Sequence, residues 1–415
     1  MESIPPSYTP SPPSPSYSPS PPSPSYSTQL LPGEQTVEET RRRSLQALNT
    51  GVFRRITDST TLVLRDQQPG SITPVYGRNG LVRGHISLRS SEGLVEVTLK
   101  LEGHLRLETS GAAITTLVAS DSYSLWSSSS TAGDPCPRTL PFAISFPSVF
   151  MDGCQPQPLP PSFENKFATC SYTLSVVVSR PRRFLSSNDS LVVSVCYHPR
   201  SRPHTPMLPS DVPFMTTVKS SPEEWHQVLS TMNATQSSRL APVQCLLFIP
   251  SVQVYPFSET IPFHLQLRAP SSSLAPFLDK FAPDHSLPVL PSGKITIRVY
   301  LLRQVVVKVF EKQKVSKQII GEGKLTYSSP LPDNHHSYRN IPLGEGIDCL
   351  DWDGELRCTE DVTVGSFTTN PLSVQDFIVL SLEPLHPLKC PLLASKHSHP
   401  IRLVTDPWSD HAVTW

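Results

Sequence analysis

The sequence predicts an all-β protein built from two β-sandwiches in tandem. Proline is abundant, with 46 of 415 residues, and only 17% of the residues are charged, which favours loop-rich β structure over long amphipathic helices. Short segments of alternating apolar and polar residues recur in two blocks of about seven. The clearest is Val299–Leu325, in which Val305, Val307 and Val309 share one face and a charged turn joins two strands. A hairpin of this kind serves as a scaffold.

The first 45 residues form a Pro/Ser/Tyr-rich tail in which the heptapeptide SPPSPSY occurs at 11–17 and again at 20–26. A segment of this composition buries too little apolar surface to offset the conformational entropy lost on ordering. We therefore expect residues 1–45 to be disordered, with polyproline-II character.

Residues 46–199 are expected to form the first sandwich. Alternation in Val82–Leu88 and in Val95–Leu101, with a Glu-Gly turn at 92–93, predicts a hairpin with one buried face. Further strands are expected at Ala143–Phe146, Tyr172–Val178 and Leu191–Cys196, with loops at 120–134 and 155–162.

Residues 200–240 are predicted to link the two sandwiches, because four prolines recur between 203 and 213. The linker also holds a helix signal. Ser221 suits an N-cap, Pro222 suits the first helical position, and the two glutamates that follow complement the helix dipole. We expect a short helix that ends near Met232.

Residues 241–385 are expected to form the second sandwich and residues 386–415 a C-terminal tail. Because Ile401, Leu403 and Trp408 would otherwise be exposed, we expect this tail to fold back on the body as a strand or anchor; a partner-docking peptide is the alternative. Strands are expected at Gln244–Ile249, Phe263–Leu267, Ile295–Leu301, Val305–Phe310, Gln318–Tyr327 and Phe377–Leu382, with a long loop at 330–361.

The balance of 35 basic and 35 acidic residues argues against a nucleic-acid-binding protein. No secretory signal and no apolar run of about 20 residues is visible, so we expect a cytoplasmic protein with reduced cysteines. The histidines at 335–336 and at 397 and 399 have no further ligands at zinc spacing, and no Gly-x-Ser-x-Gly, HExxH or phosphate-loop motif occurs. We therefore expect no catalytic residue, no metal and no cofactor.

Several longer motifs resemble the arrestin-like proteins, specifically the fungal branch of the α-arrestins. VYGRNGLVRGHISL (75–88) and GLVEVTLKLEGHL (93–105) look like the family's opening strands, which end in Leu-x-Gly. LPFAISFP (140–147), LPPSF (159–163) and CSYTLSVVVSRP (170–181) look like its Phe-Pro strand, its Leu-Pro-Pro-Ser-Phe turn and the Tyr-x-Leu strand that follows. YPFSETIPFHLQL (255–267) and ITIRVYLLRQVVV (295–307) are similar to paired strands of the C-terminal arrestin domain.

The resemblance covers residues 50–385 and implies two immunoglobulin-like sandwiches in tandem, the arrestin fold. It also implies an adaptor that binds the cytoplasmic tails of membrane transporters or receptors. The α-branch recruits ubiquitin ligases that mark this cargo for endocytosis, which implies transient presence at the plasma membrane or endosomes.

The tail contains a PPxY sequence, Pro5-Pro6-Ser7-Tyr8. WW domains bind such motifs because a polyproline-II segment presents its prolines to an aromatic groove while the tyrosine fills a second pocket. α-Arrestins use PPxY motifs to dock WW-domain HECT-type ubiquitin ligases, so the resemblance implies this partner. In the family the motif usually follows the C-terminal domain, whereas here it stands alone at the N-terminus. A chance match within a Pro/Ser/Tyr tract is the alternative.

Two basic groups are further candidates. Guanidinium groups pair phosphate bidentately, so an arginine run at the end of the first sandwich could bind phosphorylated cargo, or could be a solvated loop. Lysines on the hairpin of the second sandwich could accept ubiquitin or contact anionic lipid, or could protect a strand edge from aggregation. The arginines are Arg180, Arg182, Arg183, Arg200 and Arg202, and the lysines are Lys308, Lys312, Lys314 and Lys317.

The function expected from these features is that of a non-catalytic adaptor between membrane cargo and a ubiquitin ligase. The alternative is a cargo-sorting scaffold of the retromer-associated type, which shares the double-sandwich fold and needs no ligase. An enzyme is disfavoured, since no pair of titratable groups stands at a plausible spacing.

Overall fold

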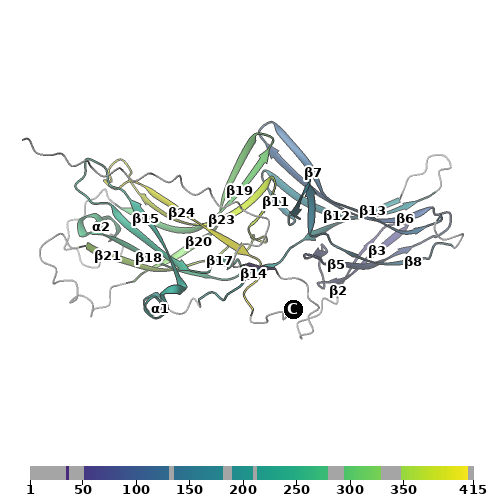
Figure 1. The fold of residues 1–415 in the computed structure, drawn as a ribbon, viewed down its shortest axis with the longest axis horizontal. Helices are drawn as coiled ribbons and strands as arrows, with labels where there is room; N and C mark the ends of the chain where they lie inside the picture. The colour runs from purple at the N-terminus through teal and green to yellow at the C-terminus, as the bar shows by residue number, and fades with distance from the viewer. Residues whose placement is uncertain are drawn as a thin grey trace, which may run out of the picture.

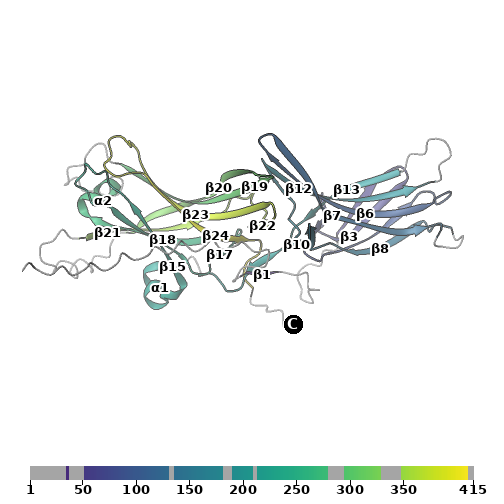
Figure 2. The same cartoon turned by 45° about the horizontal axis from the view of Figure 1, so that its top comes forward.

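The computed structural model describes residues 34–36, 51–129, 135–180, 189–208, 213–278, 294–328 and 347–409. Two β-sandwiches lie one after the other along the long axis of the molecule (Figures 1 and 2). This confirms the predicted all-β fold. The predicted disorder of the tail falls mostly outside the described residues. Glu34–Thr36 is the exception and forms a short strand, β1.

In the part of the chain that the structure describes, the N-terminal sandwich consists of a six-stranded and a four-stranded sheet. The larger sheet contains, in spatial order, β4 (Val75–Tyr76), β13 (Asp189–Tyr197), β12 (Ala168–Ser179), β6 (Glu96–Thr109) and β7 (Ala112–Ser127), with β11 (Phe163–Asn165) paired to β12. The smaller contains β2 (Gly51–Ile56), β3 (Thr60–Gln67), β5 (Leu81–Leu88) and β8 (Thr139–Ser145), and β9 (Val149–Asp152) pairs with β10 (Gln155–Pro158).

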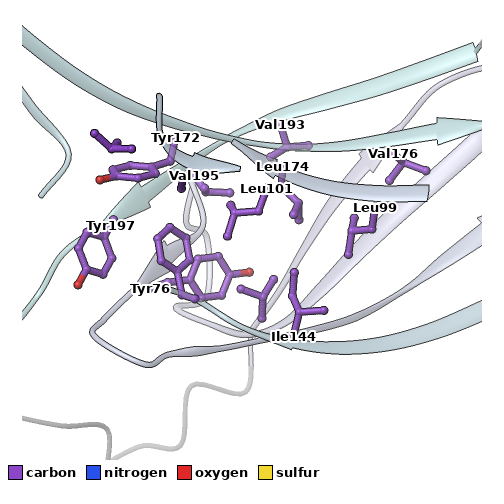
Figure 3. Close-up of a cluster of buried hydrophobic side chains, with 14 of the residues drawn as sticks. Tyr76, Leu99, Leu101, Ile144, Tyr172, Leu174, Val176, Val193, Val195 and Tyr197 are labelled. Atoms are coloured by element: carbon purple, nitrogen blue, oxygen red, sulfur yellow. The ribbon is translucent and has the colours of Figure 1, made fainter. Parts of the chain in front are cut away.

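The core between these sheets follows the alternation of the sequence, since every second residue of β5, β6 and β12 is buried. Aromatic rings close one end of this core (Figure 3). The Phe146 ring stacks on Tyr197 with ring centroids 4.9 Å apart and meets Tyr172 edge-on at 5.5 Å. Tyr76 stacks on the same phenylalanine at 5.8 Å.

The C-terminal sandwich is one ten-stranded sheet, within the described ranges, that folds over on itself. Strand β20 passes between the layers: its first part pairs with β19, and from Gly323 onward it pairs with β21. The order is β15 (Trp225–Met232), β16 (Val243–Pro250), β18 (Ile261–Pro270), β21 (Ile347–Leu356), β20 (Lys312–Ser328), β19 (Ile295–Val309), β23 (Leu372–Pro384), β24 (Ser395–Val404) and β17 (Val254–Pro256), with β22 (Phe367–Thr369) paired to β23. A helix, α2 (Ser271–Leu278), follows β18.

The predicted hairpin between Val82–Leu88 and Val95–Leu101 is wrong, although both segments are strands. β5 pairs with β3 and β8, whereas β6 pairs with β12 and β7, so the turn at 92–93 joins opposite sheets. Alternation reveals that a strand has one buried face, but two strands that bury the same core from opposite sides show the same pattern as two paired strands.

The predicted helix from 222 to 232 is also wrong. Pro222–Glu224 forms a single 3-10 turn, and β15 follows at once. All eight residues of β15 pair with β16, so sheet pairing overrides the local helix signal. The helix of this region is α1 (Phe214–Ser220), and the linker also contains β14 (Ser201–Pro203).

Three segments expected to be loops contain strands. β7 occupies much of 120–134, β10 lies in 155–162, and β21 lies in 330–361. The C-terminal tail folds back on the body, because β24 pairs with β23 and β17. The sequences of β7, β10 and β21 look like loops because they contain many polar or acidic residues, as is expected for strands that have one face or edge in solvent.

Candidate functional site

The two sandwiches share a packed interface, and β19 builds most of it. Val305, Val307 and Val309 are buried and belong to the hydrophobic core of the N-terminal sandwich, together with Leu372 and Val374 of β23. The predicted common face of the three valines is therefore confirmed, and it is the face that joins the two halves of the molecule. Burial of this apolar surface makes the pair one platform.

Polar and aromatic contacts extend this interface. The rings of Phe163 in β11 and Phe367 in β22 meet edge-on with centroids 5.6 Å apart. Asn370 Nδ2 donates to Asp152 Oδ2 at 2.7 Å. These contacts hold β22 and the turn between β22 and β23 against the N-terminal sandwich.

The LPPSF segment supports the interface from the N-terminal side. The Tyr172 hydroxyl donates to the carbonyl of Pro160 at 2.5 Å, and the Ser162 hydroxyl accepts the amide N–H of Tyr197 at 2.9 Å. Phe163, which ends the segment, is the residue that touches Phe367. The motif thus ties the aromatic end of the N-terminal core to the C-terminal sandwich.

The two longest hairpins in the described part of the chain meet at the interface and form a crest, defined here as Thr109–Ala112 at the end of β6–β7 and Val309–Lys312 at the end of β19–β20 (Figures 1 and 2). The tips touch: Lys312 Nζ donates to the carbonyl oxygen of Ser110 at 3.3 Å. Both sandwiches contribute to the crest, and it carries the exposed side chain of Phe310, which makes it a candidate docking surface.

A buried ion pair lies between β19 and β23. Arg303 Nε and Nη2 donate to the two carboxylate oxygens of Asp376 at 2.8 and 2.9 Å. The Ser366 hydroxyl also donates to Asp376, at 2.7 Å, and accepts the amide N–H of Leu403 from β24 at 2.8 Å. Each buried charge has partners, and the network connects the interface strand to the C-terminal strand.

A second group of charges joins the linker to the end of the described chain. Arg200 pairs bidentately with Asp406, and its Nε donates to Asp406 Oδ2 at 3.0 Å. Burial alone would raise the pKa of Asp406, but hydrogen bonds from Arg200 and Thr405 outweigh it and hold the pKa below its usual range. Glu34 of β1, which pairs with β14, forms an ion pair with Arg402 of β24.

The structure separates the predicted arginine run. Arg180 follows β12 and pairs with Asp189, N–O 3.7 Å, at the start of β13. Arg200 and Arg202 lie past the other end of that nine-residue strand, which spans about 30 Å. Arg182 and Arg183 lie outside the described residues. Phosphate or cargo binding by these side chains stays a prediction.

The four predicted lysines are placed together on the β19–β20 hairpin. Lys308 and Lys317 are exposed on the face turned away from the interface, and Lys312 and Lys314 flank the tip on the other face. Their use as ubiquitin acceptors or lipid contacts stays a prediction. The motif Pro5, Pro6, Ser7 and Tyr8 lies outside the described residues.

One polar cluster was not predicted from the sequence. Buried His264 in β18 contacts Asp353 Oδ1 through Nδ1 at 2.8 Å and Asp351 Oδ1 through Nε2 at 3.1 Å, and its ring stacks on Phe214 of α1 at 3.9 Å. Burial alone would lower the pKa of His264, but the two carboxylates raise it above its ordinary value. Stacking of this ring on Phe214 holds α1 against the sheet.

Among the described residues, no group of three or more His, Cys, Asp or Glu side chains is arranged to hold a metal ion. No helix in the described ranges is long and apolar enough to cross a membrane. Each of the eight cysteines is a free thiol.

Comparison with known proteins identifies no family for this chain. No family model matches the chain, and no curated protein matches it. Among solved structures, it matches the sporulation control protein Spo0M from Bacillus subtilis at 11% identity and a TM-score of 0.21, over 51% of this chain and 77% of that one. At that TM-score the match supports no argument about function.

Proposed function

We propose that the protein is a non-catalytic adaptor that binds cytoplasmic segments of membrane cargo and recruits a WW-domain HECT-type ubiquitin ligase. The observation that carries the proposal is the shared core around Val305, Val307 and Val309, which turns two sandwiches into one platform with an exposed crest. Such a platform positions partners relative to one another. The resemblance to the α-arrestins supplies the classes of partner.

The ligase arm of this proposal depends on Pro5–Tyr8. Changing Tyr8 to Ala removes the ring that fills the second WW pocket, so capture of WW domains by the full chain should fall at least about tenfold. The measurement is pulldown with a panel of immobilised WW domains from HECT ligases.

Tyr17 and Tyr26 provide matched controls for that experiment. Both end SPPSPSY repeats of the same composition but have serine at the position of the first motif proline. Tyr17→Ala and Tyr26→Ala should leave capture unchanged. Equal capture by wild type and Tyr8→Ala would reject the ligase arm.

A ligase-independent sorting scaffold of the retromer-associated type is the second candidate. It is favoured by the position of the PPxY motif, which stands alone in the tail rather than after the C-terminal sandwich. In this case the chain should co-purify stably with coat subunits, and the Tyr8→Ala variant should do so equally well. Cargo degradation that depends on Tyr8 would exclude it.

A further inference from the structure

The tip of the β19–β20 hairpin carries an exposed aromatic side chain in a strained backbone conformation. Val309 pairs with Lys312, so Phe310 and Glu311 form a two-residue loop. Phe310 has a φ of 54°, and 83% of its surface is exposed. Left-handed backbone is uncommon for a bulky residue and is usually taken by glycine, asparagine or aspartate.

The neighbouring hairpin of the crest has its left-handed residue at the second position of the two-residue loop rather than at the first, where Phe310 lies. Its two-residue loop is Ser110–Gly111, and the left-handed position, with φ 81°, is a glycine. Phe310 therefore carries a strain that a glycine would relieve, and its exposed ring gains no packing energy within the described fold to offset it. An exposed outlier of this kind suggests a contact outside the chain.

The outward face of the same hairpin combines apolar and basic groups. Val315 and Ile319 are each 42% exposed, although large aliphatic side chains in strands are usually buried. Directly opposite residues of antiparallel strands share a face, and the register places Lys308 and Lys317 on the face of Val315. From 308 to 317 there are four lysines and one glutamate, a net charge of 4 − 1 = +3.

We propose that this hairpin tip docks on an anionic lipid bilayer. The apolar ring of Phe310 enters the interfacial region of the bilayer. Lys308 and Lys317, on the outward face of the hairpin, bind anionic headgroups. Protection of a strand edge explains the lysines but leaves the strained, exposed ring without a role. The site is the end of a hairpin that projects at the top of the view in Figure 1, a shape that suits a planar surface.

This proposal is independent of Pro5–Tyr8 and tests separately from the ligase. Purified full-length chain is sedimented with vesicles of phosphatidylcholine alone or mixed with phosphatidylserine. Binding is expected only to the mixed vesicles and should fall with added salt. Phe310→Gly should weaken it about tenfold, the loss expected for one inserted ring, and Lys308→Gln with Lys317→Gln should weaken it roughly fivefold for each lysine removed.

The chain offers matched controls at the other end of β23. Leu388 is an exposed apolar side chain and Lys389 follows it, so Leu388→Gly and Lys389→Gln should bind vesicles as wild type does. Phe310→Gly relieves the left-handed strain, so its melting temperature should equal or exceed that of wild type, and a loss of binding could not be blamed on unfolding.

Three outcomes overturn the proposal. The first is equal binding to both kinds of vesicle or to neither. The second is unchanged binding by Phe310→Gly. The third is capture of an acidic peptide such as polyglutamate by a chain that does not bind the mixed vesicles, which would assign the hairpin to an acidic protein partner.

Discussion

At the scale of single residues, the buried ion pair of Arg303 and Asp376 is the contact whose loss should lower the stability most. Both are buried and lie directly opposite each other in the register of β19 and β23. Breaking a buried pair leaves an uncompensated charge in a low-dielectric environment, whereas replacing both partners by apolar groups is often neutral. The pair therefore makes correct register between the interface strand and β23 a condition for stability.

Asp376→Ala is expected to lower the free energy of unfolding by about 3–5 kcal/mol, because it leaves the guanidinium of Arg303 buried without its carboxylate. Denaturant unfolding followed by circular dichroism measures this. The double variant Arg303→Met with Asp376→Leu should recover most of the loss. If the single and double variants are equally destabilised, the damage lies in packing rather than in the orphaned charge.

At the scale of elements, pairing explains a short sequence motif. Gly103, the glycine of the Leu-x-Gly motif, lies in the middle of β6 rather than at its end, opposite Tyr172 in the β6–β12 register. A Cβ at this glycine would stand 2.4 Å from Cε1 of the tyrosine ring. The ring cannot move freely, because its hydroxyl is bonded to Pro160 in the LPPSF segment. The Leu-x-Gly motif and the LPPSF segment, which are far apart in sequence, therefore belong to one packed unit.

Gly103→Ala should therefore destabilise the N-terminal sandwich by about 1–3 kcal/mol, the usual cost of overpacking a core. Gly77→Ala is a suitable comparison, since the nearest atom to its added Cβ is the His198 carbonyl oxygen at 3.8 Å. Thermal unfolding of both variants gives the answer. Equal melting temperatures would show that Tyr172 has more freedom than the contacts imply.

Sequence alternation identified β5, β6, β12 and β19 because each has one buried face. Alternation does not assign partners, so it predicts a hairpin of β5 and β6 that the fold does not contain. It also missed β21, where acidic residues at 348, 351 and 353 look like a loop. In the fold, Asp351 and Asp353 contact the ring of His264, which lies 87 and 89 positions away in the sequence. The carboxylates that make this segment look like a loop therefore have a partner on another strand.

The candidate site was predictable only in part. The lysines of the β19–β20 hairpin and the valine face were visible, because both lie within one continuous segment. The pairing of Arg200 with Asp406 joins residues 206 positions apart, and nothing local marks either side chain as half of an ion pair. Arg303 left a weak signal, a charged residue inside an apolar run, but its partner precedes the strand predicted at 377–382.

At the scale of the whole molecule, the interface decides whether the two sandwiches act together. Val307 is fully buried in it, whereas Val306 faces the other side of the hairpin and is half-buried. An aspartate at position 307 would place an unpaired carboxylate in the shared core, at a cost of about 3–5 kcal/mol, so Val307→Asp should loosen the platform.

Hydrogen exchange of the interface strands and the radius of gyration in solution measure that loosening. Val306→Asp is the matched comparison, and it should leave both quantities near their wild-type values. If Val307→Asp keeps the exchange protection and the compactness of wild type, the interface is not what holds the sandwiches together.

The three-residue strand β1 has a consequence for geometry at long range. It pairs Glu34 with β14, and Glu34 lies 26 residues after Tyr8. A partner bound at Tyr8 therefore lies at most about 90 Å from Glu34, the length of a fully extended chain of that size. Without β1, the next described residue along the chain is Gly51, and the upper limit becomes about 150 Å. The pairing of β1 with β14 therefore sets the upper limit on the distance between β14 and a partner bound at Tyr8.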